Sequence, residues 1–286
     1  MNYNGMFVIK YDGSGNELWG KDDALLYGAT GYSVATDNNG DVYVTGEYGA
    51  VFITKYDPSG NVLWTKSGTG SSSDFGYGVA TDANGNVFIT GTFVSPVIDF
   101  DATTLTNNGV WNIFIVKYDS FGNVLWVKGA GGSDGDEGKS ISTDANGNAY
   151  ITGYFGSSFC IFGSDTLTTA GSVNIFVAKY DSSGNVLWAK SAGGTDWDEA
   201  MDIAIDTSTG DAYVTGWFWT MSVFDNDTLI NSSLAADIFV AKLSSLFNAA
   251  ITSNNVTCYN QCTGYASANV INGSPPYSYS WNTIPI

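Results

Sequence analysis

The chain has 286 residues, 44% of them hydrophobic, which is ample for a buried globular core. With 28 acidic residues against 10 basic ones its formal net charge is -18, so nucleic acid and anionic membrane surfaces would repel it. It contains no His and every basic residue is Lys, which excludes imidazole-based nucleophile activation, His-ligated zinc and bidentate Arg clamps for phosphate or carboxylate.

The chain begins, at MNYNGMFVIKYD, in the middle of a sequence repeat. This start lacks the basic residues and the apolar stretch of a signal peptide, and no apolar run reaches the roughly 18 residues that span a bilayer. We expect a chain cut from a longer precursor, with neighbouring domains and without membrane insertion.

Two strings alternate along most of the chain. One, K-Y-D-x-x-G-N-x-L-W, occupies residues 10–19, 55–64, 117–126 and 179–188. The other, D-x-x-G-x-x-Y/F-x-T-G, starts at Asp37, Asp82 and Asp144, and in a form one residue longer at Asp206. Such self-similarity is typical of a repeat architecture.

Each period predicts four short strands, A to D, separated by turns rich in Gly, Asn, Asp and Ser. In the unit from Gly138 the strands are GKSIST, NAYITGYF, IFVAKY and NVLWAK, and the links from A to B and from C to D have the Asp-Gly chemistry of tight hairpins. This pattern favours an all-β fold of β-propeller blades, with a β-solenoid or a string of small sandwiches as alternatives.

We expect about four blades, each of four antiparallel strands, from a larger or incomplete propeller. The expected divisions are a partial blade at 1–21, blades at about 31–66, 76–128, 138–190 and 200–243, a linker at 244–250 and an incomplete second module at 251–286.

The partial first blade leaves two outcomes open. If its C and D strands dock beside the last A and B strands, a small ring closes; if they do not, the chain forms an open arc. An open arc would expose edge strands, which favours further blades upstream. Trp19, Trp64, Trp126 and Trp188, each in a D strand, are predicted to be packing anchors between blades.

An antiparallel meander places its links on two opposite faces. One face carries the stereotyped turns, and the other carries long B-to-C inserts, near 94–112, 156–174 and 219–237, together with the D-to-A loops GGSDGDEG and GGTDWDEA. Long, variable loops often carry function. The acidic residues of these loops are candidate calcium ligands, and the alternative is that they are solvated surface carboxylates. They are Asp134, Asp136, Glu137, Asp196, Asp198 and Glu199.

Aromatic residues near that second face are candidates for stacking on a ligand, with packing against a neighbouring insert or blade as the alternative. These are Trp111, Trp197, Trp217 and Trp219. Paired carboxylates would also suit glycoside hydrolysis. However, the Arg cluster of sialidase propellers has no counterpart here, and the cofactor ligands of quinoprotein dehydrogenases are not recognisable, so we expect no enzyme.

The three cysteines are too few for a disulfide framework. Cys160 stands alone within a repeat and is predicted to be a small buried apolar residue. Cys258 and Cys262 enclose three residues, and a local disulfide between them is one of two open alternatives.

The strings together resemble the bacterial SBBP β-propeller repeat over about residues 6–243, most clearly in IFVAKYDSSGNVLWAKSAGGTDWDEAMDIAID and GDAYVTGWF. The 45-residue second unit departs from this pattern because it lacks the B-to-C insert. From about Ile251, the sequence ITSNNVTCYNQCTGYASANVINGSPPYSYSW resembles the opening of a SprB-type repeat, an immunoglobulin-like module of large Bacteroidetes surface proteins.

This resemblance implies export, often by the type IX route, and display at or release from the cell surface. Neither family supplies a ligand or a catalytic residue for a numbered position. We expect a non-enzymatic extracellular binding or adhesion scaffold whose partner is a polysaccharide or a surface protein. A purely structural spacer and a fragment of a propeller enzyme are the alternatives, and calcium is the one cofactor considered.

Overall fold

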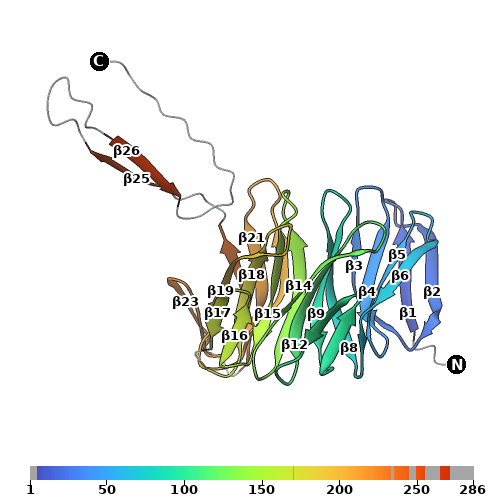
Figure 1. Ribbon diagram of the computed structural model, residues 1–286, viewed down its shortest axis with the longest axis horizontal. Helices are drawn as coiled ribbons and strands as arrows, with labels where there is room; N and C mark the ends of the chain where they lie inside the picture. Colours follow the sequence, from blue (N-terminus) through green and yellow to red (C-terminus); the bar gives the residue numbers. More distant parts are fainter. Residues whose placement is uncertain (1–4, 170, 233–234, 245–248, 255–264, 271–286) are drawn as a thin grey trace, which may run out of the picture.

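The computed structural model describes residues 5–169, 171–232, 235–244, 249–254 and 265–270 (Figure 1). Every regular element in this part of the chain is a β-strand, and the same residues include no helix long and apolar enough to cross a membrane. All the strands pair antiparallel, in sheets of two to four strands, so the predicted all-β fold is confirmed.

The repeat folds into five successive sheets, which we call blades 1 to 5. Blade 1 is the hairpin of β1 (Gly5–Tyr11) and β2 (Glu17–Tyr27). Blade 2 comprises β3 (Thr30–Thr36), β4 (Val42–Glu47), β5 (Val51–Tyr56) and β6 (Val62–Ser67). Blade 3 comprises β8 (Asp74–Thr81), β9 (Val87–Phe93), β12 (Asn112–Tyr118) and β13 (Val124–Ala130).

Blade 4 comprises β14 (Asp136–Thr143), β15 (Ala149–Phe155), β18 (Asn174–Tyr180) and β19 (Val186–Ala192). Blade 5 has three described strands, β20 (Asp198–Ile205), β21 (Ala212–Phe218) and β24 (Asp237–Leu243). Blades 2 to 4 show the complete predicted order A-B-C-D. Strands B and C of blades 3 and 4 are buried throughout, because both faces of these sheets pack against neighbouring structure.

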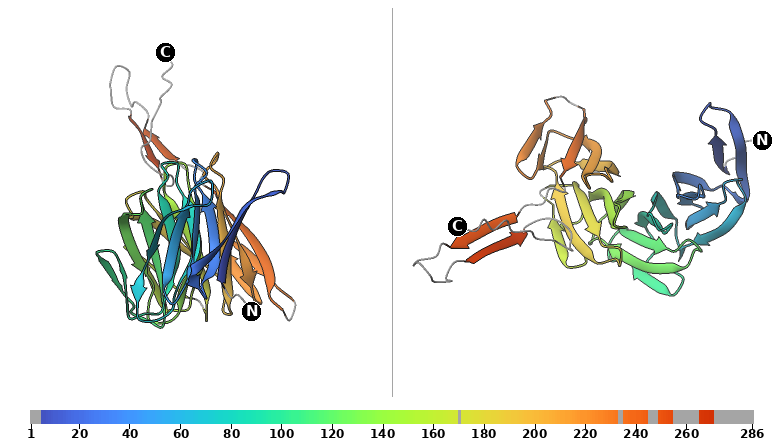
Figure 2. Two further views of the ribbon diagram at one scale, coloured as in Figure 1. Left: turned by 90° about the vertical axis from the view of Figure 1, so that its right-hand side faces the viewer. Right: turned by 90° about the horizontal axis from the view of Figure 1, so that it is seen from above.

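The blades stand side by side in an open arc, as the right-hand view of Figure 2 shows. The A strands β3, β8, β14 and β20 contact one another in that order and form the inner edge of the arc, so the D strands form its outer edge. In the described sheets, β1 and β2 pair only with each other, and β24 fills position C beside β21. Of the two outcomes left open by the sequence, the structure therefore shows the arc.

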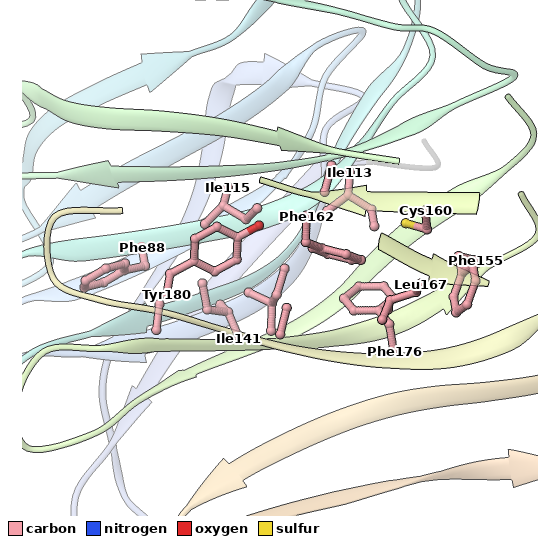
Figure 3. Packing of buried hydrophobic residues seen from close by; sticks show 14 residues of the cluster. Phe88, Ile113, Ile115, Ile141, Phe155, Cys160, Phe162, Leu167, Phe176 and Tyr180 are labelled. Atoms are coloured by element: carbon pink, nitrogen blue, oxygen red, sulfur yellow. The ribbon is translucent and has the colours of Figure 1, made fainter. Parts of the chain in front are cut away.

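Hydrophobic cores lie between consecutive blades. The core between blades 3 and 4 joins Phe88 and Ile115 to Phe155 and Phe176, all at most 1% exposed (Figure 3). Burial of each such side chain stabilises the fold by about 1.5–3 kcal/mol. Because each core draws on two blades, no blade can bury its faces alone.

A Trp latch joins each of the first three D strands to the next blade. The indole Nε1 of Trp64 donates a hydrogen bond to Ser120 O at 3.2 Å, and that of Trp126 donates to Ser182 O at 3.1 Å. Gly122 and Gly184, in the receiving turns, lie flat against these rings, where an added Cβ would stand 3.1 and 2.8 Å from an indole carbon. The same turn carbonyls accept hydrogen bonds from the lysines of the repeat, Lys55 and Lys117.

Of the other two anchors, Trp19 follows the same pattern, and Trp188 follows it only in part. Trp19 Nε1 donates to Pro58 O at 3.0 Å, and its ring lies 6.4 Å from that of Tyr56 in blade 2. Trp188 contacts Tyr150 of its own blade, with ring centroids 6.0 Å apart.

The B-to-C inserts form extra hairpins that the sequence analysis missed. They are β10 (Val97–Phe100) with β11 (Thr103–Thr106), β16 (Phe159–Phe162) with β17 (Asp165–Thr168), and β22 (Met221–Phe224) with β23 (Asp227–Ile230). The two-residue strand β7 (Thr69–Gly70) pairs with β10. Figure 1 shows β16, β17 and β23 at the end of the blades opposite the tight turns.

Each insert is a wedge between the outer edges of two blades. In the middle insert, Cys160 and Phe162 are fully buried and belong to the core between blades 3 and 4. The prediction that Cys160 is a buried apolar residue is therefore confirmed. Some apolar side chains of the inserts thus complete the cores, while others, such as Phe159 and Ile230, are exposed, and a ligand-facing role of the inserts stays a prediction.

The second module is described only as an antiparallel hairpin of β25 (Ala249–Asn254) and β26 (Tyr265–Val270). Cys258 and Cys262 lie outside the described residues.

Candidate functional site

The D-to-A loops do not hold their acidic residues together. Successive residues of a strand point to opposite sides, so Asp136 and Glu137 diverge. Asp136 is fully buried and accepts hydrogen bonds from Gly132 N, Ser157 N and Ser157 Oγ at 2.7, 3.2 and 2.8 Å. Asp134 is exposed and accepts one from Gly135 N.

Blade 5 repeats this arrangement with one change. Asp198 is buried and accepts hydrogen bonds from Gly194 N at 2.6 Å and Trp219 N at 3.2 Å. Thr220 replaces the serine of the other blades, and its hydroxyl donates to Asp196 instead. Burial, together with the nearby Asp196 charge, outweighs the backbone hydrogen bonds and raises the pKa of Asp198 to about 6.

The buried aspartates anchor the inserts. Asp74 of blade 3 likewise accepts from Val94 N, Ser95 N and Ser95 Oγ. Blade 2, which lacks an insert, has Ala29 at the equivalent position. The carboxylate thus accompanies the insert, which explains its presence without a metal ion.

The proposed calcium clusters are corrected accordingly. In the described part of the chain, no three acidic, His or Cys side chains are grouped so that they could hold a metal ion. The oxygens of Asp136 and Asp198 already accept hydrogen bonds from the loops, and only Glu137 and Glu199 turn toward the inner edge.

The four predicted tryptophans have different surroundings. Trp111 lies over Gly135, where an added Cβ would stand 2.5 Å from its ring, so it serves packing. Trp219 is 39% exposed at the start of the last insert. Trp197 is 46% exposed and lies 6.3 Å from Trp217 between ring centroids. These last two join a larger group on the inner edge of the arc.

A β-bulge in every A strand creates this inner surface. In β3, β8, β14 and β20 the register shifts by one residue, and the extra residues are Tyr32, Tyr77, Lys139 and Met201. A bulge re-aims the side chain of its extra residue and is common beside functional sites. The scaffold therefore presents one variable side chain per blade at an equivalent place.

An aromatic strip follows these bulges from blade 2 to blade 5. We define it as Tyr32, Phe75, Tyr77, Tyr154, Trp197 and Trp217. Within blades 2 and 3, Tyr32 contacts Tyr77 edge-on at 5.1 Å, and Tyr77 stacks on Phe75 at 5.7 Å. In blades 4 and 5, Trp197 lies 6.3 Å from both Tyr154 and Trp217.

Lys139 connects the two halves of the strip. Its ammonium lies 4.7 Å from the ring centroid of Tyr77 and 5.2 Å from that of Tyr154, which are cation–π distances. It also pairs with the carboxylate of Glu137. Glu199 accepts a hydrogen bond from Trp197 Nε1 at 2.8 Å, and burial raises its pKa against that bond and the Lys139 charge.

The strip combines exposed ring faces with carboxylates. Tyr32 and Trp197 are 44% and 46% exposed, whereas Tyr154 between them is 7% exposed. Ring faces stack on the apolar C–H faces of sugars, and carboxylates accept hydrogen bonds from hydroxyls. This arrangement suits binding of an extended, hydroxyl-rich ligand.

Sequence analysis named Trp197, Trp217, Glu137 and Glu199 but missed the rest of this surface. The missed residues are Tyr32, Phe75, Tyr77, Lys139 and Tyr154. The signal was present: three bulge residues in equivalent positions, Tyr77, Lys139 and Met201, differ in character while the residues around them repeat.

Comparisons with known proteins agree with the repeat. The family model SBBP, described as a beta-propeller repeat, matches residues 67–92 and 125–154. The chain is 29% identical over 106 residues to an uncharacterized WD repeat-containing protein, L264, of Acanthamoeba polyphaga mimivirus. It is 30% identical over 114 residues to the regulatory protein FlaEY of Caulobacter vibrioides.

These matches are partial. They cover 35% and 38% of this chain but only 8% and 12% of the two relatives. A crystal structure of a protein of unknown function from Bacteroides caccae aligns with 84% of this chain and 72% of its own, at 12% identity and a TM-score of 0.42. The matched repeats and the four-stranded antiparallel sheets show that the chain is built of β-propeller blades.

Proposed function

We propose that the chain is a non-enzymatic, extracellular binding scaffold whose aromatic strip holds a polysaccharide. The observation that carries this proposal is the aromatic strip. It joins exposed rings, carboxylates and a lysine held between two tyrosine rings, and it lies at the β-bulges, where the otherwise repetitive blades differ. The net charge of -18 argues for a neutral or weakly charged glycan rather than a polyanion such as nucleic acid.

The wider context belongs to the same proposal. The SprB-like sequence from about Ile251 supports display on a cell surface, and such a module would place the propeller in a long surface protein. A surface protein as partner, instead of a glycan, and a spacer without any ligand are the outcomes against which the proposal is tested.

The test is retention of the purified chain on a panel of immobilised neutral polysaccharides and surface proteins. We expect saturable retention on a subset of the polysaccharides. Trp197→Ala combined with Trp217→Ala should weaken retention about fivefold or more, since each lost aromatic contact costs about 0.5–1.5 kcal/mol.

The matched control is Phe121→Ala. Phe121 is 80% exposed in the turn between β12 and β13, at the end of the blade away from the inserts, and should not matter for retention. An equal loss of retention in both variants would contradict ligand binding at the aromatic strip. Retention on proteins alone would favour an adhesin for proteins, and no retention at all would leave a spacer.

A further inference from the structure

A second polar site lies at the outer edge, between blades 3 and 4. A pocket of about 290 Å³ is lined by Lys128 and Gly129 of β13, Gly163 and Ser164 of the β16–β17 turn, and Tyr180 with the following turn residues Gly184–Val186. This volume stands at the small end of ligand pockets. It lies at the opposite edge of the sheet from the aromatic strip.

The three insert hairpins differ at one residue beside this place. Asp101 and Asp225 follow the first strand of their hairpins, with φ of 51° and 49°. The middle hairpin has Gly163 there, with φ of 57°. This residue thus has the same left-handed conformation in all three hairpins, and only the middle hairpin lacks a carboxylate at this position.

The other two hairpins show where that carboxylate lies. In blade 5, Asp225 forms an ion pair with Lys190, the β19 counterpart of Lys128, at 3.1 Å. In blade 3, burial raises the pKa of Tyr118, and the nearby Asp101 charge raises it further, so this carboxylate lies near the tyrosine hydroxyl.

The middle pocket keeps both partners of the missing carboxylate. Lys128 is half-buried and has no ion pair within the described ranges. Tyr180 is 1% exposed, and its hydroxyl has no hydrogen-bond partner in the described part of the protein. Figure 3 shows this hydroxyl directed toward the hairpin that carries Phe162. A buried, unpaired hydroxyl costs free energy unless something occupies the site.

We propose that this pocket binds the carboxylate of a uronic-acid-type sugar, which takes the place of the absent aspartate between Lys128 and Tyr180. Lys128 supplies the charge and the Tyr180 hydroxyl donates a hydrogen bond. Ser164 and Asn185 line the same space, and their polar side chains suit sugar hydroxyls. The neighbouring Asp165 carboxylate accepts hydrogen bonds from Ala189 N and Ser164 Oγ, and its negative charge acts against the attraction that Lys128 supplies.

The experiment is calorimetric titration of the whole chain with sodium glucuronate, glucose and acetate. We expect glucuronate to bind, acetate to bind more weakly and glucose not to bind. Lys128→Gln should weaken the affinity for glucuronate about tenfold or more, because hydrogen bonds between charged groups are stronger than those between neutral groups. Lys66→Gln, at the equivalent lysine below Asp101, is the matched control and should leave binding unchanged.

The most decisive variant introduces the missing carboxylate at residue 163. Gly163→Asp restores the residue that the other two hairpins carry, and it should abolish glucuronate binding by pairing with Lys128. The Val186 methyl group, 2.9 Å from the added Cβ, has to move, so thermal unfolding of this variant must be compared with that of the parent chain. Tyr180→Phe removes the hydroxyl alone and should weaken binding by a smaller factor.

Three results would overturn the proposal: no glucuronate binding, equal binding of glucose, or unchanged binding in a folded Gly163→Asp variant. Polysaccharide retention by the aromatic strip should persist in Lys128→Gln, so a failure of one site is distinguishable from a failure of the other.

Discussion

Single residues of the repeated strings make the same contacts between successive blades. The glycines of the C-to-D turns in blades 2 to 4 have a positive φ and also admit the indole of the preceding blade. Gly184 has a φ of 83°, and Trp126 lies against it. The string K-Y-D-x-x-G-N-x-L-W is therefore an inter-blade device, because its Lys and Trp reach the next turn and its Gly receives the previous Trp.

Replacing Gly184 by Ala should lower the free energy of unfolding by about 2 kcal/mol or more. The new Cβ would meet Trp126 at 2.8 Å in a backbone conformation that L residues avoid. Urea unfolding followed by tryptophan fluorescence measures the loss. Gly13→Ala is the control, since no atom lies within 4 Å of its added Cβ and its φ is not positive; a similar loss there would disprove the latch.

Asp198 should make stability depend on pH. Its pKa is raised from 3.8 to about 6 in the folded chain, so between these values the folded chain binds more protons than the unfolded chain. Its contribution to stability is then fully present below about pH 3.8 and is lost as the pH rises through about 6.

Thermal unfolding of the parent chain and of Asp198→Asn, measured from pH 4 to pH 7, tests this effect. The parent should lose melting temperature relative to the variant as the pH rises. The fixed cost of the lost backbone hydrogen bond shifts the variant at every pH and does not change the slope. Parallel curves for the two proteins would contradict the raised pKa.

Among the elements, the sequence pattern predicts the blade strands but not the insert hairpins. The blade strands were predicted closely, because their alternation and Asp-Gly turns are local signals. The hairpins β10–β11, β16–β17 and β22–β23 were not, because strands of four residues give too short a pattern to recognise. Their role as wedges follows from Phe100 and Phe162, which enter the cores that their own blades share with the preceding blades.

Asp136→Ala should destabilise the chain by about 3 kcal/mol or more. It removes the acceptor of Gly132 N, Ser157 N and the Ser157 hydroxyl at a buried place, and each orphaned donor costs about 1–3 kcal/mol. Amide hydrogen exchange should locate the loosened region at β16 and β17. Asp134→Ala, in the same loop but exposed, should cost less than about 1 kcal/mol; equal costs would show that the buried carboxylate is no anchor.

For the molecule as a whole, the excess of acidic residues should oppose compactness. Added sodium chloride should raise the melting temperature, because it screens repulsion within a chain of net charge -18. Calcium chloride at matched ionic strength should have the same effect, since the buried loop carboxylates have hydrogen-bond donors instead of a metal. A calcium-specific rise, reversed by chelator, would restore the calcium hypothesis.

The sequence by itself determined the all-β class, the four-stranded blades, the turn chemistry and the Trp positions, since these depend on neighbours within one hairpin. Only the tertiary structure decided the open arc, the buried state of Asp136 and Asp198, and the aromatic strip. The strip depends on bulges that re-aim Tyr32, Tyr77 and Lys139, and on A strands that lie side by side although about 45 to 62 residues separate them. Such contacts arise from packing between blades, and no local pattern in one repeat encodes them.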